Sequence, residues 1–167
     1  MDLWIARHGP NDMSGPEYLD RERGLTPRGV KHVAAIAMQM KQDAEKPRGI
    51  FASVFKRTTE TADILGRVLE SRVIPTTDLC PEMPLMVFLG KLIAARHSGM
   101  MLVGHHTNIA ALLAECADGV APEVLACGEV RRYVCDGEYR MKLAYRVTPA
   151  QVGMLDMITL SQALGVR

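Results

Sequence analysis

The stretch LWIARHGP at residues 3–10 decides how this chain is expected to fold. Its first four residues are apolar, and a glycine and a proline end any regular element just after Arg7 and His8. This pattern predicts a buried strand at residues 3–6 that runs directly into a loop carrying an arginine and a histidine. Similar short apolar runs predict further strands at residues 49–54, 73–75 and 100–103.

Helices are expected between these strands. Thr26 and Pro27 form a typical helix start, with the threonine as the cap and the proline at the first helical position. Apolar residues then recur at helical spacing, which predicts a helix at residues 27–42. The same spacing predicts further helices: one capped by Thr58 or Thr59, one at residues 84–97, and one after the turn at residues 104–107.

The last third of the chain changes character. Residues 130–135 and 139–147 are expected to be strands, and they flank Asp136-Gly137, a frequent hairpin turn. A short helical tail is expected from Pro149 onward. Strands that alternate with helices and end in a hairpin predict an α/β fold. We expect a three-layer sandwich whose central sheet is mostly parallel, with helices on both faces and an antiparallel C-terminal edge hairpin.

Length and composition indicate a single folded domain at residues 1–167. A chain with 48% hydrophobic and 23% charged residues can bury a core and does not have a disordered composition. The 20 Lys and Arg against 19 Asp and Glu give a net charge of +1, which provides no field for nucleic acid or an anionic membrane. Apolar stretches fall short of the ~18 residues of a membrane span, and no targeting segment is recognised, so we expect a cytoplasmic protein.

Residues capable of chemistry follow three of the predicted strands. Arg7 and His8 follow the first strand, Arg57 follows the second, and His105 follows the strand at residues 100–103. Because ligands of such sheets bind beyond the carboxyl ends of the strands, we expect these side chains to meet at one edge. Two arginines and two histidines without matching carboxylates suit a phosphate dianion. A neutral imidazole can attack phosphorus, which predicts phosphoryl transfer through a phosphohistidine.

An ordered set of motifs gives the chain a family resemblance. It resembles the histidine phosphatase superfamily, the relatives of phosphoglycerate mutase, in Arg7-His8-Gly9, LTPRG at 25–29, Ser53 with RTTETA at 57–62, and Gly104-His105. The resemblance covers roughly residues 1–115. Within the superfamily the short chain is most similar to the SixA-like phosphohistidine phosphatases, and LCPE at 79–82 and LLAEC at 112–116 are similar to that subgroup too.

The resemblance implies a role for each matched residue. His8 is expected to be the nucleophile, Arg7 and Arg57 are expected to clamp the phosphoryl group, and His105 is expected to stabilise it. These roles agree with the chemistry of the cluster. No metal is expected, because the arginines and a histidine already supply the positive charge that a cation gives other phosphatases. The four cysteines have no CxxC pair, so neither a zinc site nor a disulfide framework is expected.

Two further candidates have competing interpretations. Arg23 matches an arginine that the SixA-like subgroup places near the phosphate, but Arg21 and Arg28 lie close enough in sequence to take its place. A solvated loop charge is the alternative for Arg23. Glu82 is the candidate acid that protonates the leaving group, and a simple helix-start carboxylate is the alternative.

The chain departs from the family pattern at two positions. Pro10 follows the first triplet where many members carry an acidic residue, and His106 follows the second histidine where small or apolar residues are common. Neither change removes a catalytic group. Both positions are expected on the rim of the pocket, where they would affect substrate preference.

These features predict a metal-independent phosphatase that acts on phosphohistidine in a protein, because the chain lacks the long insertions that would cover a small-substrate pocket. The alternative enzyme is a phosphomonoesterase for a small metabolite such as a sugar or nucleotide phosphate, with the loop at 11–24 or the hairpin as a partial lid. A non-catalytic phosphate-binding module is a third interpretation, against which the intact cluster argues. No cofactor, nucleic acid or membrane partner is expected.

Overall fold

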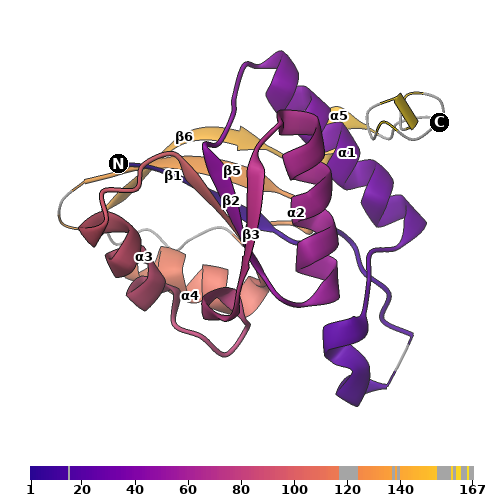
Figure 1. The fold of residues 1–167 in the computed structure, drawn as a ribbon, viewed down its shortest axis with the longest axis horizontal. Helices are drawn as coiled ribbons and strands as arrows, with labels where there is room; N and C mark the ends of the chain where they lie inside the picture. Colours follow the sequence, from indigo (N-terminus) through magenta and orange to yellow (C-terminus); the bar gives the residue numbers. More distant parts are fainter. Residues whose placement is uncertain are drawn as a thin grey trace.

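The computed structural model describes residues 1–14, 16–116, 124–136, 138, 140–153, 159, 161, 162 and 165, and for residues 17–19 it describes the backbone alone. The described residues form one six-stranded sheet in the order β3-β2-β4-β1-β5-β6 (Figure 1). The strands are β1 (Asp2–Arg7), β2 (Gly49–Ser53), β3 (Arg72–Thr76), β4 (Met100–Gly104), β5 (Val130–Cys135) and β6 (Met141–Val147).

The pairing of the strands makes four of them parallel and adds an antiparallel edge. β4 pairs with β1 and β2, and β2 pairs with β3, all in parallel, whereas β5 runs antiparallel to β1 and β6. The carboxyl ends of β1, β2 and β4 therefore reach the same edge of the sheet. The mostly parallel sheet with an antiparallel C-terminal hairpin is confirmed.

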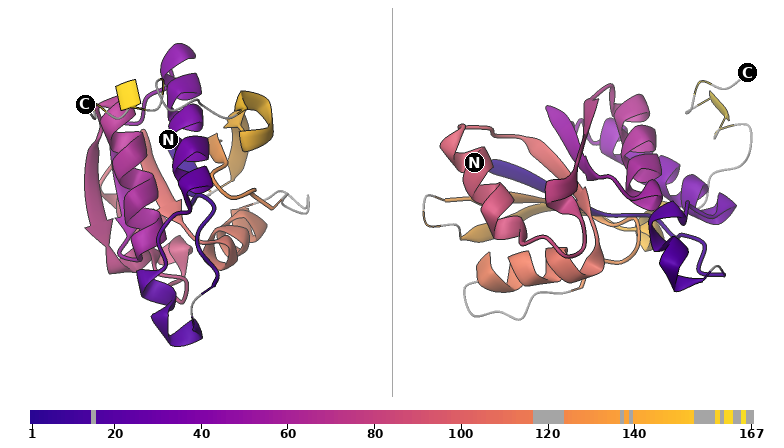
Figure 2. Two further views of the ribbon diagram at one scale, coloured as in Figure 1. Left: turned by 90° about the vertical axis from the view of Figure 1, so that its right-hand side faces the viewer. Right: turned by 60° about the horizontal axis from the view of Figure 1, so that its bottom comes forward.

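Helices cover both faces of the sheet (Figure 2). One face carries α1 (Pro27–Gln42), α2 (Lys56–Leu69) and the short α5 (Pro149–Val152), and the other face carries α3 (Leu85–Ala94) and α4 (His106–Cys116). Two short 3-10 helices, η1 (Glu17–Glu22) and η2 (Thr77–Leu79), complete the regular elements of the described residues. The expected three-layer sandwich is confirmed. None of the helices in the described residues is both long and apolar enough to span a bilayer.

β1 contributes to the core on both of its faces. Trp4 and Ala6 pack in the cluster under α1 and α2, while Leu3 and Ile5 pack in the cluster under α3 and α4. This division follows from the strand period of two, which points successive side chains to opposite faces. All four side chains are buried, as expected for a strand that is covered on both faces and whose sequence is a continuous apolar run. Full burial of a leucine- or isoleucine-sized side chain stabilises the fold by roughly 1.5 to 3 kcal/mol.

The start of α1 fixes the loop that follows β1. Thr26 caps the helix as predicted, because its Oγ1 accepts from the Gly29 N–H at 3.0 Å. The Thr26 N–H in turn donates to the Pro10 carbonyl at 3.0 Å. A Cβ on Gly29 would lie 2.0 Å from the same carbonyl oxygen, so this helix can approach the loop only with a glycine there.

Three helix boundaries differ from the expectation. α4 begins at His106, inside the residues 104–107 that were expected to form a turn. α2 begins at Lys56 with Phe55 as its N-cap, rather than after a cap at Thr58 or Thr59. The Thr58 hydroxyl donates to the carbonyls of Ser53 and Phe55, so it is used inside the first turn. α3 ends at Ala94 instead of residue 97, because the chain turns through residues of positive φ beyond it.

The remaining differences lie in the connections. η1 occupies part of the segment at 11–24 that was expected to be an irregular loop. The hairpin closes through the Asp136 N–H, which donates to the Arg140 carbonyl at 3.1 Å, and β6 begins at Met141 instead of residue 139. The predicted turn residue Gly137 lies outside the described residues, as does most of the expected tail beyond Gly153.

Candidate active site

Two strand ends and one helix start bring two histidines and an arginine together. His8 follows β1, His105 follows β4, and Arg57 lies in the first turn of α2. The His8 N–H donates to the Gly104 carbonyl at 3.1 Å, which extends the β1–β4 pairing beyond the strand. The two imidazole rings lie 5.5 Å apart, and Arg57 Nη2 lies 3.3 Å from His105 Nδ1. All three side chains are buried, so these predicted site residues share one enclosed environment.

The orientation of His8 leaves one ring nitrogen without a hydrogen-bond partner among the described residues. Its Nδ1 lies 2.8 Å from the Gly9 carbonyl oxygen, and because a carbonyl only accepts, Nδ1 must carry the proton. Nε2 then keeps its lone pair. Burial, followed by the nearby Arg57 and Arg7, lowers the pKa of His8 to about 4 even though the Gly9 hydrogen bond opposes the shift. At neutral pH the side chain is therefore a neutral imidazole with an available Nε2, which is the form of a nucleophile.

His105 is held at both ring nitrogens. Arg57 can only donate, so His105 Nδ1 accepts from it, and Nε2 donates to Ser53 Oγ at 3.0 Å. The His105 N–H donates to Asn108 Oδ1 at 3.2 Å, and Phe55 packs edge-on at 4.9 Å between ring centres. Burial and the charge of Arg57 lower the pKa of His105 to about 3. His105 is thus neutral at pH 7, and an anion that binds beside it would favour its protonation.

Titration of the two buried imidazoles gives a direct prediction. The pKa values of about 4 and about 3 mean that neither ring should titrate between pH 5 and pH 8. Imidazole 15N shifts followed by NMR, assigned with His8→Asn and His105→Asn, should stay those of neutral rings over that range. Because the unfolded chain takes up these protons near pH 6.5, stability should also fall as the pH drops from 6.5 toward 4. A midpoint near 6.5 for either ring would contradict this arrangement.

Arg7 reaches the same edge from the end of β1. Its Nη1 donates to the Leu125 carbonyl at 2.8 Å, and its backbone N–H donates to the Glu129 carbonyl at 3.1 Å. Nε of Arg7 is buried and has no hydrogen-bond partner among the described residues. A buried donor without a partner is costly in a finished structure, so this N–H is available to a ligand.

A buried carboxylate, which the sequence did not indicate, holds the turn that carries Leu125. Glu129 is 1% exposed, and its Oε1 accepts from Nε of both Arg131 and Arg146 at 2.7 Å. Its Oε2 accepts from the Ala126 N–H at 2.8 Å. The only sequence signal was the spacing of Glu129 and Arg131, two residues apart at the start of β5. Through this turn Glu129 supports the backbone that binds Arg7.

The next prediction concerns the stability that Glu129 provides. Glu129→Ala should lower the free energy of unfolding by about 3 to 5 kcal/mol, because the change removes the buried counter-charge of Arg131, whose side chain is 5% exposed. Urea unfolding measures the difference. The control is Glu138→Gln, which breaks an ion pair with Arg140 between two exposed side chains and should cost less than ~1 kcal/mol. Equal effects of the two changes would show that the Glu129 cluster is not a structural support.

Asp20 of η1 is a second residue that the sequence did not indicate. Its carbonyl oxygen accepts from Arg57 Nη1 at 2.7 Å, and its Oδ2 accepts from Arg57 Nη2 at 3.0 Å. Its Oδ1 lies 3.4 Å from Arg23 Nη1. The spacing of three residues between Asp20 and Arg23 fits one helical turn and was a weak signal for their contact.

The three candidate arginines near η1 are separated by their positions. Arg23 joins the site through Asp20, and the backbone beside it is fixed because Glu60 of α2 accepts from the Leu25 N–H at 2.6 Å. Arg21 has a side chain that is 65% exposed and lies over the ring of Phe55. Arg28 is exposed on α1. Among the described residues, Arg23 is therefore the one of the three that shares a carboxylate partner with Arg57.

Glu82 lies at the rim, outside the buried group. Its side chain is 59% exposed, and it forms an ion pair with Arg21 at 3.7 Å. Arg21 and Arg57 both lie over the ring of Phe55, at 5.2 and 4.9 Å. Glu82 is thus connected to the site through Arg21 and Phe55, and the structure does not bring it into contact with either imidazole.

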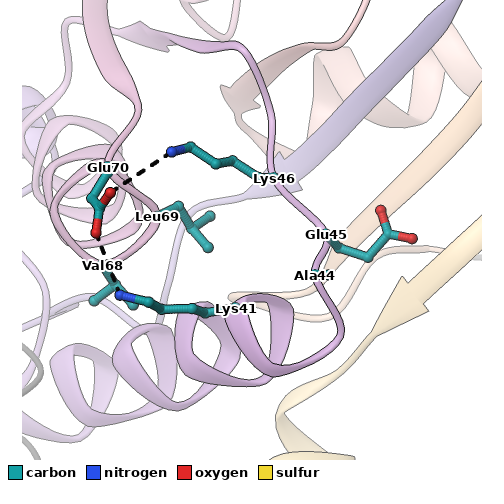
Figure 3. A pocket seen from close by; sticks show the side chains of 7 residues that line it. All are labelled: Lys41, Ala44, Glu45, Lys46, Val68, Leu69 and Glu70. Atoms are coloured by element: carbon teal, nitrogen blue, oxygen red, sulfur yellow. Dashed lines mark ion pairs between the residues drawn. The ribbon is translucent and has the colours of Figure 1, made fainter.

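Three hollows of the described surface lie at different places relative to the buried group of His8, Arg57 and His105. An open depression of about 380 Å³ lies beside Arg23 and is also lined by Lys56 and Glu60. A narrow apolar crevice passes Arg7 and His106. The third, at the C-terminal ends of α1 and α2, contains Glu70 between Lys41 and Lys46 (Figure 3). It lies at the opposite ends of these helices from Arg57, so only the first two border the group.

The electrostatics of the group favour an anion over a metal ion. No cluster of three or more His, Cys, Asp and Glu side chains that could hold a metal is present within the described part of the chain. The guanidinium groups and imidazoles that meet at this edge suit phosphoryl oxygens. The expectation that the arginines have no matching carboxylate is wrong, because Asp20 of η1 pairs with Arg57 and Arg23. A neutral histidine with an available Nε2 beside arginines can attack phosphorus while the guanidinium groups stabilise the charge on the transferred group.

Comparison with known proteins identifies the family. Residues 3–92 match the model of the histidine phosphatase superfamily (branch 1), and the chain belongs to this superfamily. It is therefore an enzyme of the phosphatase class. No sequence in the set of curated proteins matches the chain.

Solved structures share the fold at low sequence identity. The protein histidine phosphatase SixA complexed with tungstate has a TM-score of 0.81 at 20% identity, over 92% of this chain and 100% of that one. A mycobacterial glucosyl-3-phosphoglycerate phosphatase complexed with VO3 has a TM-score of 0.67 at 16% identity, over 86% and 97% of the two chains. YhfR from Bacillus stearothermophilus has a TM-score of 0.65 at 17% identity, over 86% and 95%. At such identities the likeness shows the fold alone.

Proposed function

We propose that this phosphatase hydrolyses phosphohistidine on a protein by way of a phosphoryl group on His8. The observation that carries the proposal is the hydrogen bond from His8 Nδ1 to the Gly9 carbonyl, which leaves Nε2 free beside Arg57 and His105. His8 Nε2 forms a bond to phosphorus as the bond from phosphorus to the substrate imidazole breaks, and that imidazole, already protonated at its other ring nitrogen, leaves as a neutral ring. Water then attacks phosphorus, releases phosphate and returns the lone pair to Nε2.

The other site residues have roles in this proposal that follow from their charges. Arg57, Arg7 and Arg23 bind the phosphoryl oxygens, since guanidinium groups match the geometry of phosphate. The unpartnered Nε of Arg7 and the shared partner of Arg57 and Arg23 support this assignment. His105 takes up a proton as the anion arrives and stabilises the charge on the transferred group.

A protein substrate is supported by the surroundings of the site. Exposed apolar side chains occur on three of the segments around it: Met13 beside Arg23, Val54 after β2, and Met83 beside Glu82. Exposed apolar groups around a polar site are common where a protein docks. The structural neighbour SixA is a protein histidine phosphatase, which agrees with this substrate. We further propose that the reaction takes place in the cytoplasm, where phosphorylated carrier proteins would be the partners.

The test is a comparison of turnover on two kinds of substrate. A carrier protein phosphorylated on histidine and a panel of sugar and nucleotide monophosphates are supplied at equal concentrations, each with and without a chelator. The protein substrate should be hydrolysed with the higher kcat/KM, and the chelator should leave the rate unchanged, because no metal is part of the proposed step. A clear preference for a small phosphoester would overturn the substrate assignment. Loss of activity in chelator would overturn the metal-free mechanism.

A small metabolite is the second candidate, and one observation favours it. The open depression of about 380 Å³ beside Arg23 adjoins the proposed phosphate site and could receive the rest of a small molecule. Its lining mixes Arg23 and Lys56 with the carboxylates of Glu22 and Glu60. The structural neighbour glucosyl-3-phosphoglycerate phosphatase acts on such a metabolite. Activity confined to one ester of the panel would establish this candidate.

The role of Glu82 gives a prediction that separates the two candidates. An alkoxide leaving group needs a proton in the transition state, whereas a departing imidazole has a conjugate-acid pKa of about 6.5 and can leave already protonated. Glu82→Gln should therefore reduce phosphohistidine turnover by much less than the ~100-fold typical of a lost acid, while any phosphoester activity falls sharply. An equal, large loss on both substrates would contradict the leaving-group argument. No loss on either would make Glu82 a rim carboxylate paired with Arg21.

A further inference from the structure

The carboxylate of Asp20 lies where an anion bound to Arg57 would lie. Asp20 contacts Arg57 through its carbonyl oxygen at 2.7 Å and through Oδ2 at 3.0 Å, while Oδ1 faces Arg23 at 3.4 Å. One carboxylate thus lies between two arginines. A guanidinium group binds carboxylate and phosphate oxygens with the same planar fork of donors, so the two anions compete for the same positions.

The donors of Arg57 are largely occupied in this state. Nη2 carries two hydrogens, and within the described part of the chain it contacts Asp20 Oδ2 and His105 Nδ1. Nη1 donates one hydrogen to the Asp20 carbonyl. A phosphoryl group that binds both terminal nitrogens must therefore replace at least one of these partners.

The negative charge of Asp20 also reaches both imidazoles. It raises the pKa of His8 and of His105, against the stronger lowering by burial and by Arg57. A phosphate dianion in the proposed site would act on the same two rings with the same sign. Position and charge together make Asp20 resemble the substrate anion.

The surroundings of Asp20 allow it to leave. Its side chain is 39% exposed, whereas the side chain of Arg57 is 8% exposed. Asp20 belongs to η1, a six-residue 3-10 helix that follows Pro16 (indigo in Figure 1, near the N-terminal end of α2). A carboxylate that is already partly hydrated loses little on turning into water, while Arg57 stays buried and needs an anion.

We propose that Asp20 is a specificity-determining residue, an internal anion that occupies Arg57 and Arg23 until a phosphoryl group displaces it. This inference rests on the proposed phosphate site. A dianionic phosphoryl group offers more charge than Asp20 and can replace it, whereas a monoanionic carboxylate gains nothing by the exchange. The site would therefore reject acidic side chains of proteins and carboxylate metabolites while it accepts phosphoryl groups.

The experiment measures anion binding to the full-length protein by calorimetry, with orthophosphate and acetate as probes. Asp20→Asn and Asp20→Ala should bind orthophosphate ~10-fold more tightly or better, because a competing charge-assisted contact is lost. Acetate binding should become measurable only in these variants. In both Asp20 variants the KM for the phosphoprotein should fall, and kcat should change by a smaller factor than KM. Asp63→Asn, which removes an exposed carboxylate from α2, is the control for net charge. It should leave orthophosphate binding, acetate binding and KM unchanged.

The outcomes separate this inference from the proposed function. In one outcome wild type binds orthophosphate and turns over phosphohistidine, but both Asp20 variants bind phosphate equally well or more weakly. Asp20 then only positions Arg57, so this inference fails while the proposed function stands. If neither wild type nor either variant binds orthophosphate, the proposed phosphate site fails and takes the inference with it. Thermal unfolding of each variant verifies that it is folded. Tighter phosphate binding without acetate binding would also overturn the proposed selectivity.

Discussion

Replacing His8 with alanine is expected to lower kcat/KM for phosphohistidine protein by at least ~10⁴-fold, because the group that forms the bond to phosphorus is gone. Binding of orthophosphate should persist, since Arg57 and Arg23 keep their donors. The measurement is single-turnover hydrolysis under conditions in which wild type completes the reaction. Persistent phosphate binding in the inactive variant would show that the loss is chemical and not a failure to fold.

The matched control for this variant is His97→Ala. His97 is exposed after the end of α3, away from the sheet edge that carries His8. Its removal should leave the rate within a factor of two or so of wild type, as expected for a surface substitution. A His8→Ala protein with full activity would exclude His8 as the nucleophile.

Arg57→Ala has the second-largest expected effect, a loss of about 2 to 4 kcal/mol of transition-state stabilisation, or roughly 30- to 1000-fold in kcat/KM. Arg57 is buried, lies 3.3 Å from His105 Nδ1, and is expected to donate to the oxygens that gain charge. Arg57→Lys should recover only part of the rate, because an ammonium group cannot make the planar two-point contact. Initial rates at several substrate concentrations separate kcat from KM.

The control for this pair of variants is Arg67→Ala, which removes the same charge from an exposed position in the last turn of α2. It should leave the rate essentially unchanged. If Arg57→Lys were fully active, a point charge would suffice and the two-point clamp would be wrong. If Arg57→Ala were fully active, Arg57 would have no part in the reaction.

The central layers of the fold were predictable because their signals are local. The apolar run of β1 is bounded by a glycine and a proline, and Thr26-Pro27 marks a helix start that the structure confirms through the Gly29 N–H. The meeting of His8, Arg57 and His105 was also predictable, because the carboxyl ends of parallel strands share one edge. For α2 the local signal was wrong, since Thr58 turns its hydroxyl back to carbonyls in the first turn instead of capping the helix.

The parts that escaped prediction depend on contacts between distant segments. Asp20 meets Arg57 across 37 positions of the chain, and Leu125 meets Arg7 across 118. Glu129 pairs with Arg146 of the antiparallel strand β6 across 17 positions of the chain. No periodicity or motif reports such pairs, because each depends on the register of a sheet or on the path of a loop.

The most direct test of the central claim is the chemical form of the trapped intermediate. The wild-type enzyme is mixed with labelled phosphohistidine protein, and the reaction is quenched within milliseconds in base. Peptide mapping then identifies the labelled residue of the enzyme, and 31P NMR identifies the ring nitrogen that carries the phosphate. We expect base-stable, acid-labile phosphate on Nε2 of His8, because Nδ1 donates its hydrogen to the Gly9 carbonyl. Label on another residue, on Nδ1, or on no residue while turnover proceeds would contradict it.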